Sequence, residues 1–273
     1  PSLRIDSVLG ETLEQTQSVR KTGLTFAPEA GTQRLRDVIN KGVTEQQLYD
    51  SVHDAFSKGW SGVKLYFMIG LPTETQEDLD GIAHLAQVVL DAYFAVPKEQ
   101  RQKGLRVGVS ASSFVPKPFT PFQWEAQDSI AALERKQQLL RDAIRTRKIT
   151  YHYHDAHVSY IEAVFARGDR RLSRVLLRAH ELGCKLDGWD EYFRYDLWLQ
   201  AFSDCGVDPD FYTTRGFAED EILPWQTMDV GVSRAFFLRE RALAYQSVTT
   251  PDCRTKCAGC GARALSERGV CDE

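Results

Sequence analysis

The sequence predicts an α/β protein followed by an α-rich extension and a cysteine-rich tail. Over the first 125 residues, short apolar and β-branched runs alternate with amphipathic helical stretches, the pattern of β/α units on a parallel sheet. Beyond that point the strand rhythm gives way to helical spacing. Four of the six cysteines lie in the last 21 residues. We therefore expect three segments, at residues 1–125, 126–248 and 249–273.

Composition narrows the class of protein further. The chain has 273 residues, of which 42% are hydrophobic and 11% aromatic, and its apolar runs are too short for a membrane span. A formal net charge of −4 does not indicate the excess of positive charge that is typical of nucleic-acid-binding proteins. Cysteines grouped at metal-site spacing and the absence of a signal peptide favour a cytoplasmic protein. Because the chain begins without methionine, we expect a fragment of a longer protein.

Strands and helices are predicted by periodicity and by capping residues. Thr44 and Gln47 form a capping box before one helical stretch, Gly59 can end that helix, and Thr75 can cap the next. The expected strands are 3–9, 23–27, 62–69 and 105–115. Later helices are expected near 130–144, 158–167, 170–182, 190–205 and 233–246.

Ligands of β/α proteins bind at the carboxyl ends of the strands, so the residues that follow each strand matter most. After the second strand, Glu29 brings a carboxylate to this edge, with Arg34 and Arg36 one turn later. A zwitterionic ligand would suit this arrangement. The alternative is that Pro28 and Glu29 only begin a helix, where a negative charge is favourable.

The third and fourth strands end in equally unusual segments. Gly70, followed by Leu71-Pro72, would let a flat ligand such as a purine approach the backbone, although a plain strand-to-helix turn explains it too. The fourth strand carries three serines and continues into a proline-rich and aromatic loop, 114–124. Such a loop either covers a site or serves as a packed surface connector.

Together these segments resemble the radical S-adenosylmethionine (SAM) superfamily. Residues 23–31 resemble its fourth-strand motif, residues 66–75 its fifth-strand "GxIxGxxE" region, and residues 109–121 its sixth strand and following loop. Residues 3–6 would then belong to the third strand. The resemblance implies the carboxyl-terminal half of a partial β/α barrel.

Within the superfamily, the best fit is a bacterial group in which a cobalamin-binding-like domain precedes the barrel. Its helical region is similar to residues 154–202 here, and its Asp-Cys-Arg tail to residues 252–254. Cobalamin is therefore a candidate cofactor through an upstream domain.

The resemblance implies a radical SAM enzyme that uses a 4Fe-4S cluster to cleave SAM reductively, and the 5'-deoxyadenosyl radical then modifies an unidentified substrate, with RNA as one candidate. Flavodoxin or ferredoxin would supply the electron. Matched by motif, the residues near the amino acid or ribose of SAM would be Glu29, Gly31 and Arg34. Those near adenine would be Ile69 and Gly70, and those on the adenine and substrate side Ser110, Ser112, Val115 and Pro116.

The tail cysteines have cluster spacing, Cys253-x3-Cys257-x2-Cys260, and Cys271 is a candidate fourth ligand. In the superfamily the catalytic cluster binds a C-x3-C-x2-C loop after the first strand, and no such loop occurs in the part of the barrel matched here. We therefore expect the catalytic ligands outside this chain, and zinc or an auxiliary iron-sulfur cluster at the tail. Unliganded thiols are the simpler alternative.

Two other clusters have competing interpretations. His152, His154 and His157 are metal-ligand candidates, but a half-exposed strand before a helix explains them equally well. The arginines at 167, 170, 171 and 174 could bind phosphate, or form a solvated helix face paired with Asp169.

A different class of function is also open for the chain as a whole: a non-catalytic scaffold whose zinc-binding tail contacts nucleic acid or a protein.

Overall fold

The computed structural model describes residues 23–253 and 255–262, which form two compact units. The expected strand at residues 3–9 and Cys271 lie outside the described residues. Among the described residues, the first unit comprises 23–112, 134–153 and 243–249, and the second comprises 113–133, 154–242, 250–253 and 255–262.

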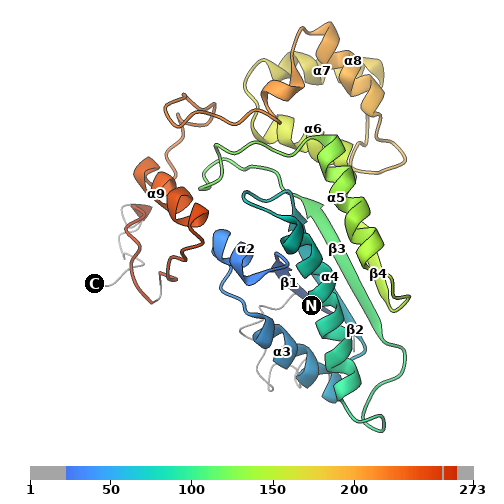
Figure 1. Cartoon of the computed structure of the whole chain (residues 1–273). Coiled ribbons are helices and arrows are strands. Elements are labelled where there is room, and N and C mark those ends of the chain that lie inside the picture. Colours follow the sequence, from blue (N-terminus) through green and yellow to red (C-terminus); the bar gives the residue numbers. More distant parts are fainter. Residues whose placement is uncertain (1–22, 254, 263–273) are drawn as a thin grey trace. The chain divides into compact units, whose positions relative to one another are not determined.

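The first unit contains a four-stranded sheet in the order β1-β2-β3-β4 (Figure 1). The pairs β1–β2 and β3–β4 are both parallel. The strands are β1 (Leu24–Glu29), β2 (Gly62–Ile69), β3 (Arg106–Ser113) and β4 (Ile149–Tyr153). The strand order therefore follows the chain order, which confirms the expected α/β class.

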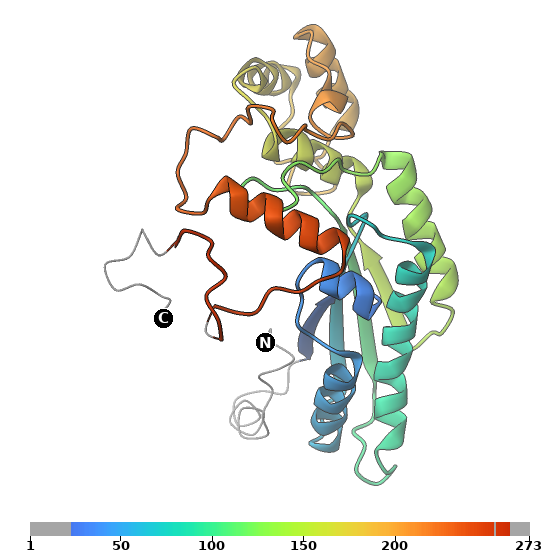
Figure 2. The ribbon, with the colours of Figure 1, turned by 60° about the vertical axis from the view of Figure 1, so that its left-hand side comes forward.

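A sequential strand order fixes where the helices lie. Each crossover between parallel strands is right-handed, so successive crossovers in one direction place their helices on one face of the sheet. Figures 1 and 2 show this arrangement for α3 (Glu45–Ser57), α4 (Gln76–Ala95) and α5 (Ile130–Ala143). In a doubly wound sheet, helices would cover both faces.

Burial along the strands alternates accordingly. In β2, Val63, Leu65, Phe67 and Ile69 are all at most 3% exposed, whereas the intervening positions are exposed or half-buried. The buried faces of α3 and α4 supply the matching apolar side chains. The apolar side of the sheet is thus the core of the first unit, and the opposite side carries small and polar residues.

The predicted helix starts are confirmed. Thr44 and Gln47 form a capping box at the start of α3, and Thr75 and Asp78 form one at the start of α4. A short helix, α2 (Gln33–Val38), begins after Thr32, whose hydroxyl accepts the N–H of Leu35.

The sheet extends beyond residue 125, where the sequence analysis placed the end of the α/β segment. Strand β4 pairs with β3 from Val107–Ile149 to Ala111–Tyr153. Its five residues are mostly exposed, so it lacks the apolar alternation that marks a buried strand. An edge strand of this kind gives a weak signal in sequence.

The second unit is helical, as predicted. Its helices α6 (Ala156–Ala166), α7 (Leu172–Leu182) and α8 (Tyr195–Asp204) bury a common cluster that includes Tyr160, Val175 and Trp198. A 3-10 helix, η2 (Pro209–Phe211), and helix α9 (Arg234–Tyr245) follow. A second cluster gathers Trp124 and Trp225 with other aromatic and aliphatic side chains.

No helix in the described residues combines the length and apolarity that a membrane crossing requires.

Candidate functional site at the carboxyl edge of the sheet

The ends of β1, β2 and β3 bring three predicted site residues to one edge of the sheet. Glu29 ends β1, Gly70 follows β2, and Ser112 lies one residue before the end of β3. The Ser112 hydroxyl donates to the carbonyl of Phe67 at 3.3 Å, which ties β3 to β2 beside this edge. The parallel strands therefore gather these residues as the sequence predicted.

Glu29 occupies an unusual backbone conformation. Its φ of 69° is in the left-handed region, which a non-glycine residue rarely adopts. The register between β1 and β2 shifts between Phe26 and Glu29, so the strand is distorted just before this residue. The carboxylate is 28% exposed and lies 3.4 Å from the Lys41 ammonium. It therefore remains accessible to a ligand with a positive group.

The Gly70 turn is closed by Glu74, a residue that sequence reasoning did not single out. Both carboxylate oxygens of Glu74 accept the N–H of Gly70 at 3.0 Å, and Oε1 also accepts the Lys136 ammonium at 2.5 Å. The Glu74 side chain is only 2% exposed. A buried carboxylate four residues after a left-handed glycine thus holds the turn from inside, and the Gly70-x3-Glu74 spacing was the signal for it.

Arg34 is engaged on the helical side of the edge. Its guanidinium donates to the Thr73 carbonyl at 2.9 Å and to the Asp78 carboxylate. Asp78 also accepts the Thr32 hydroxyl and both the N–H and the hydroxyl of Thr75, at 2.8 and 2.9 Å. In this structure Arg34 therefore joins the start of α2 to the start of α4.

The pKa of Asp78 reflects this network. Burial alone would raise the pKa of this 1% exposed side chain, but the hydrogen bonds from Thr32, Thr75 and Arg34 outweigh burial and lower it. The carboxylate is consequently charged at neutral pH.

Gly31 has a packing role. A Cβ on Gly31 would lie 2.1 Å from the Asp78 carbonyl oxygen and 2.5 Å from the Ile82 nitrogen. The facing residue on α4 is Gly81, where a Cβ would meet Gly31 in return. Backbone-to-backbone contact between this loop and α4 therefore requires glycine at both positions.

The remaining predicted site residues do not lie together: some are on strands of the sheet, and others belong to the second unit. Ile69 is fully buried in the apolar alternation of β2, so only its backbone lies at the edge. Ser110 is 6% exposed and pairs with His152 of β4. Val115 and Pro116 are buried in the second unit.

The polar side of the sheet contains a hollow at the amino ends of its strands. Its volume is about 730 Å³, and its lining includes Thr25, Lys64, Gly108 and His152. The Lys64 ammonium lies 4.7 Å from the centre of the Tyr66 ring, and Tyr66 is 37% exposed. This side of the sheet is thus polar and accessible in the structure described.

The three tail cysteines that the structure describes, Cys253, Cys257 and Cys260, do not form a preassembled metal centre. Cys253 and Cys257 are exposed and Cys260 is half-buried. No three His, Cys, Asp or Glu side chains among the residues described are placed to hold a metal ion, and this includes the histidines at 152, 154 and 157. His157 instead packs against Tyr195, with ring centres 4.4 Å apart.

The turn at Cys260 nevertheless has features of a ligand loop. The N–H of Ala262 donates to the Cys260 sulfur at 3.4 Å, and Gly259 and Gly261 have φ values of 69° and 99°. The Cys260 carbonyl accepts the N–H of Ser233 at 2.8 Å, next to the start of α9.

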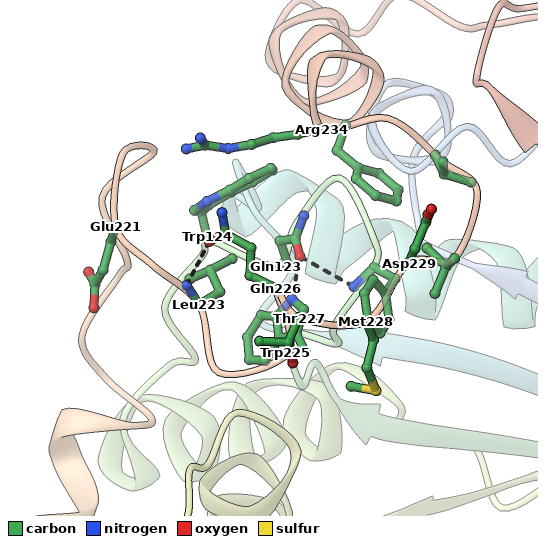
Figure 3. A pocket seen from close by; sticks show the side chains of 14 residues that line it. Gln123, Trp124, Glu221, Leu223, Trp225, Gln226, Thr227, Met228, Asp229 and Arg234 are labelled. Carbon is green, nitrogen blue, oxygen red and sulfur yellow. Dashed lines mark hydrogen bonds between the residues drawn. The ribbon is translucent and has the colours of Figure 1, made fainter.

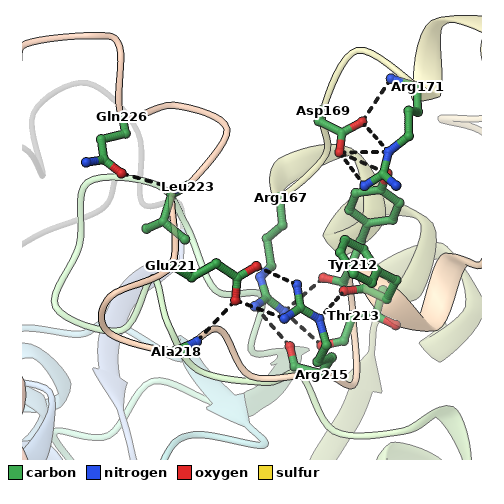
Figure 4. Close-up of polar contacts among 11 residues, drawn as sticks. Arg167, Asp169, Arg171, Tyr212, Thr213, Arg215, Ala218, Glu221, Leu223 and Gln226 are labelled. Atoms are coloured by element: carbon green, nitrogen blue, oxygen red, sulfur yellow. Dashed lines mark hydrogen bonds and ion pairs between the residues drawn. The ribbon is translucent and has the colours of Figure 1, made fainter.

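The arginine cluster has a largely structural arrangement (Figure 4). Arg167 is fully buried and donates to the carbonyls of residues 212, 213 and 215 at 2.8–3.1 Å. Arg171 pairs with Asp169 at 2.7 Å. Arg170 and Arg174 are exposed. The pairing with Asp169 matches the solvated-face interpretation for Arg171, whereas the burial of Arg167 was not foreseen.

No family model matches the chain. The chain is similar to "Uncharacterized protein MJ0966" of Methanocaldococcus jannaschii, with 31% identity over 206 residues. The match covers 76% of this chain but 43% of that protein, so the chain spans less than half of its relative's length. The name of the relative states no activity, so a conclusion about function depends on the residues of this chain and on the geometry of the candidate site.

Proposed function

We propose that this chain is the carboxyl-terminal half of a radical SAM barrel, and that the carboxyl edge of its sheet binds SAM within a longer cytoplasmic enzyme. The observation that carries the proposal is the sheet itself, with strands in sequential order and helices along one face. The opposite face carries mostly small and polar residues. A β/α barrel has this arrangement, with the side chains of the second face directed inward. Upstream strands would complete the barrel.

The residues at the edge fit the chemistry of SAM. The Glu29 carboxylate can accept the ammonium of the methionine part, and the left-handed Gly70 lets a flat base approach the backbone after β2. Ser112 stands on the neighbouring strand, although its hydroxyl is bonded to Phe67. Gly31 and Arg34 would support this edge through their contacts with α4 rather than touch the ligand.

The described residues do not fit a catalytic 4Fe-4S cluster, because no three cysteines gather among them. We therefore keep the prediction that its ligands lie outside this chain and assign no catalytic step to residues of this chain. The substrate, the electron donor and the use of cobalamin belong to the whole enzyme.

SAM binding by the full-length natural protein tests the proposal. Calorimetry should give saturable binding, and Glu29→Gln should raise the Kd about tenfold, because an ionic hydrogen bond becomes a neutral one. Glu77→Gln, at an exposed position in the first turn of α4, is the matched control. Equal Kd values for the two variants would remove Glu29 from the site.

A second measurement addresses the reaction. After anaerobic reconstitution with iron and sulfide and reduction with dithionite, the full-length protein should release 5'-deoxyadenosine from SAM, whereas residues 1–273 alone should not. A full-length protein that neither binds SAM nor releases this product would refute the proposal.

The turn around Cys260 favours one alternative, a scaffold with a zinc-binding tail. Its N–H···S bond and left-handed glycines are suited to a thiolate that ligates a metal. A full-length protein that contains stoichiometric zinc but does not bind SAM would favour this alternative.

A further inference from the structure

The second unit contains a pocket whose lining includes none of the residues assigned above to the carboxyl edge of the sheet (Figure 3). Its volume is about 260 Å³, close to the lower limit for sites that hold small organic molecules. Phe119, Leu223 and Phe237 give it apolar walls, and they belong to the buried cluster around Trp124 and Trp225. All the lining residues belong to one unit.

The two tryptophans of this pocket differ in how their indole N–H groups are satisfied. Trp225 Nε1 donates to Gln123 Oε1 at 2.6 Å, in a buried hydrogen bond. Trp124 is only 2% exposed, yet its Nε1 is buried without an acceptor in the part of the chain described. A buried N–H without an acceptor costs free energy, and a bound acceptor would remove this cost.

The same pocket has a cation at its rim. Arg234, the first residue of α9, is exposed and makes no ion pair or hydrogen bond through its side chain among residues 23–253 and 255–262. The start of a helix adds positive potential at this point. Of the two carboxylates in the lining, Glu221 is paired with Arg215 at 2.8 Å, and Asp229 is exposed and accepts the N–H of Gly231.

From these observations we propose that the pocket binds a small organic anion with an apolar body, such as an aromatic or branched aliphatic carboxylate. The body packs between the apolar walls, and the carboxylate accepts from Trp124 Nε1 and pairs with Arg234. The pocket thus pairs a buried donor with an otherwise unpaired cation. This site is independent of the proposed SAM site and does not require it.

The test uses 3-phenylpropionate as the probe, titrated into the full chain by calorimetry. Its neutral amide, 3-phenylpropanamide, keeps the ring and removes the charge, and propionate keeps the charge and removes the ring. We expect saturable binding of 3-phenylpropionate, with both comparison compounds at least about fivefold weaker, since each lacks one of the two interactions.

Variants locate the binding. Arg234→Gln should weaken 3-phenylpropionate about fivefold without changing the affinity for the amide. Arg174→Gln, at an exposed position on α7 outside the pocket, is the matched control and should bind like the parent. Trp124→Phe removes the N–H and should also weaken binding; because it alters a buried position, its fold is checked by circular dichroism.

Three results would overturn the proposal. They are the absence of saturable 3-phenylpropionate binding, an amide that binds as tightly as the acid, and Arg234→Gln behaving like Arg174→Gln. If Trp124→Phe does not fold, the comparison of Arg234→Gln with Arg174→Gln still tests the proposal, since both positions are exposed and their substitution should leave the fold intact.

Discussion

The two units differ in what holds their irregular segments in place. In the first unit, two loops at the carboxyl edge of the sheet are held by local contacts: Gly31 packs directly on Gly81 of α4, and Glu74 closes the turn after β2. In the second unit, residues 205–233 contain only the 3-10 helix η2 between α8 and α9. A long irregular segment has few backbone partners of its own, so it depends on side chains to satisfy its carbonyls.

Arg167 provides that support. Its guanidinium donates to three carbonyls of this segment and lies 4.0 Å from the centre of the Phe217 ring (Figure 4). Burial, with a smaller contribution from Arg215, lowers the pKa of Arg167 to about 10, so it is still charged at neutral pH. The first unit has a similar device on a smaller scale, since Arg36, 2% exposed, donates to the carbonyls of Ala30 and Gly31. The units therefore differ in the length of the irregular segment that the buried cation holds.

The largest effect on stability is expected at this cation. Arg167→Met should destabilise the second unit by about 3–5 kcal/mol, because it removes the three hydrogen bonds of a buried guanidinium, and of the three carbonyls that of Thr213 keeps the N–H of Gln127 as a donor. Chemical denaturation measures the loss, and hydrogen exchange should place the earliest opening at residues 205–233. Arg170→Met, at an exposed position, is the control. Equal stability of the two variants would contradict the role given to Arg167.

A close contact of the first unit provides the next test. Gly31→Ala should cost about 1–3 kcal/mol, because the new Cβ forces the loop away from α4. Gly42→Ala is an apt comparison, since nothing lies within 4 Å of a Cβ there. Thermal unfolding should therefore separate the two alanine variants, and a Gly31→Ala protein as stable as Gly42→Ala would show that this backbone contact is loose.

A smaller, pH-dependent effect is expected at Asp78. Because its folded-state pKa lies below the usual 3.8, its hydrogen bonds stabilise the first unit at neutral pH, and this contribution is lost as the pH falls below about 4. Asp78→Asn should cost about 1–2 kcal/mol at pH 7 and have less effect in acid. Denaturation at several pH values tests this, and a cost that does not depend on pH would argue against the network.

The sequence predicted those parts of the fold that follow periodicity. The strands at 23–27 and 62–69, the capping box at Thr44 and the cap at Thr75 were correct, because apolar spacing and caps are local signals. Strand β4 was not predicted as part of the sheet, because the sequence of this exposed edge strand does not alternate between apolar and polar residues.

At the candidate site, the sequence predicted which residues lie at the edge but not which contacts they make. Glu29, Gly70 and Ser112 follow from the positions where strands end. The contacts of Arg34 with Asp78, and of Glu74 with Lys136, join residues 44 and 62 positions apart. Contacts at such separations depend on tertiary packing, which a single sequence does not reveal.

The last prediction concerns the tail. We expect changes there to alter the metal content of the protein and to have the smallest effect on the stability of the fold. The turn at Cys260 is held by the N–H of Ala262 and contains two left-handed glycines, and the exposed Cys253 and Cys257 would have to move to join Cys260 at one metal. We expect purified protein to contain about one zinc ion or one iron-sulfur cluster per chain at Cys253, Cys257, Cys260 and Cys271. Elemental analysis identifies which metal is bound, and an absorption band near 400 nm (an approximate position) would indicate a cluster.

Cys257→Ser should remove most of this metal, since it deletes a thiolate from the centre of the motif. Cys205→Ser, at the end of α8 beside the cluster of α6, α7 and α8 and outside the cysteine motif, should leave the metal content unchanged. The melting temperatures of the two unit cores should change little, because no hydrophobic cluster that we describe includes Cys257. Full metal content in Cys257→Ser would show that the tail does not bind the metal as a unit, and the cysteine spacing would then carry no functional meaning.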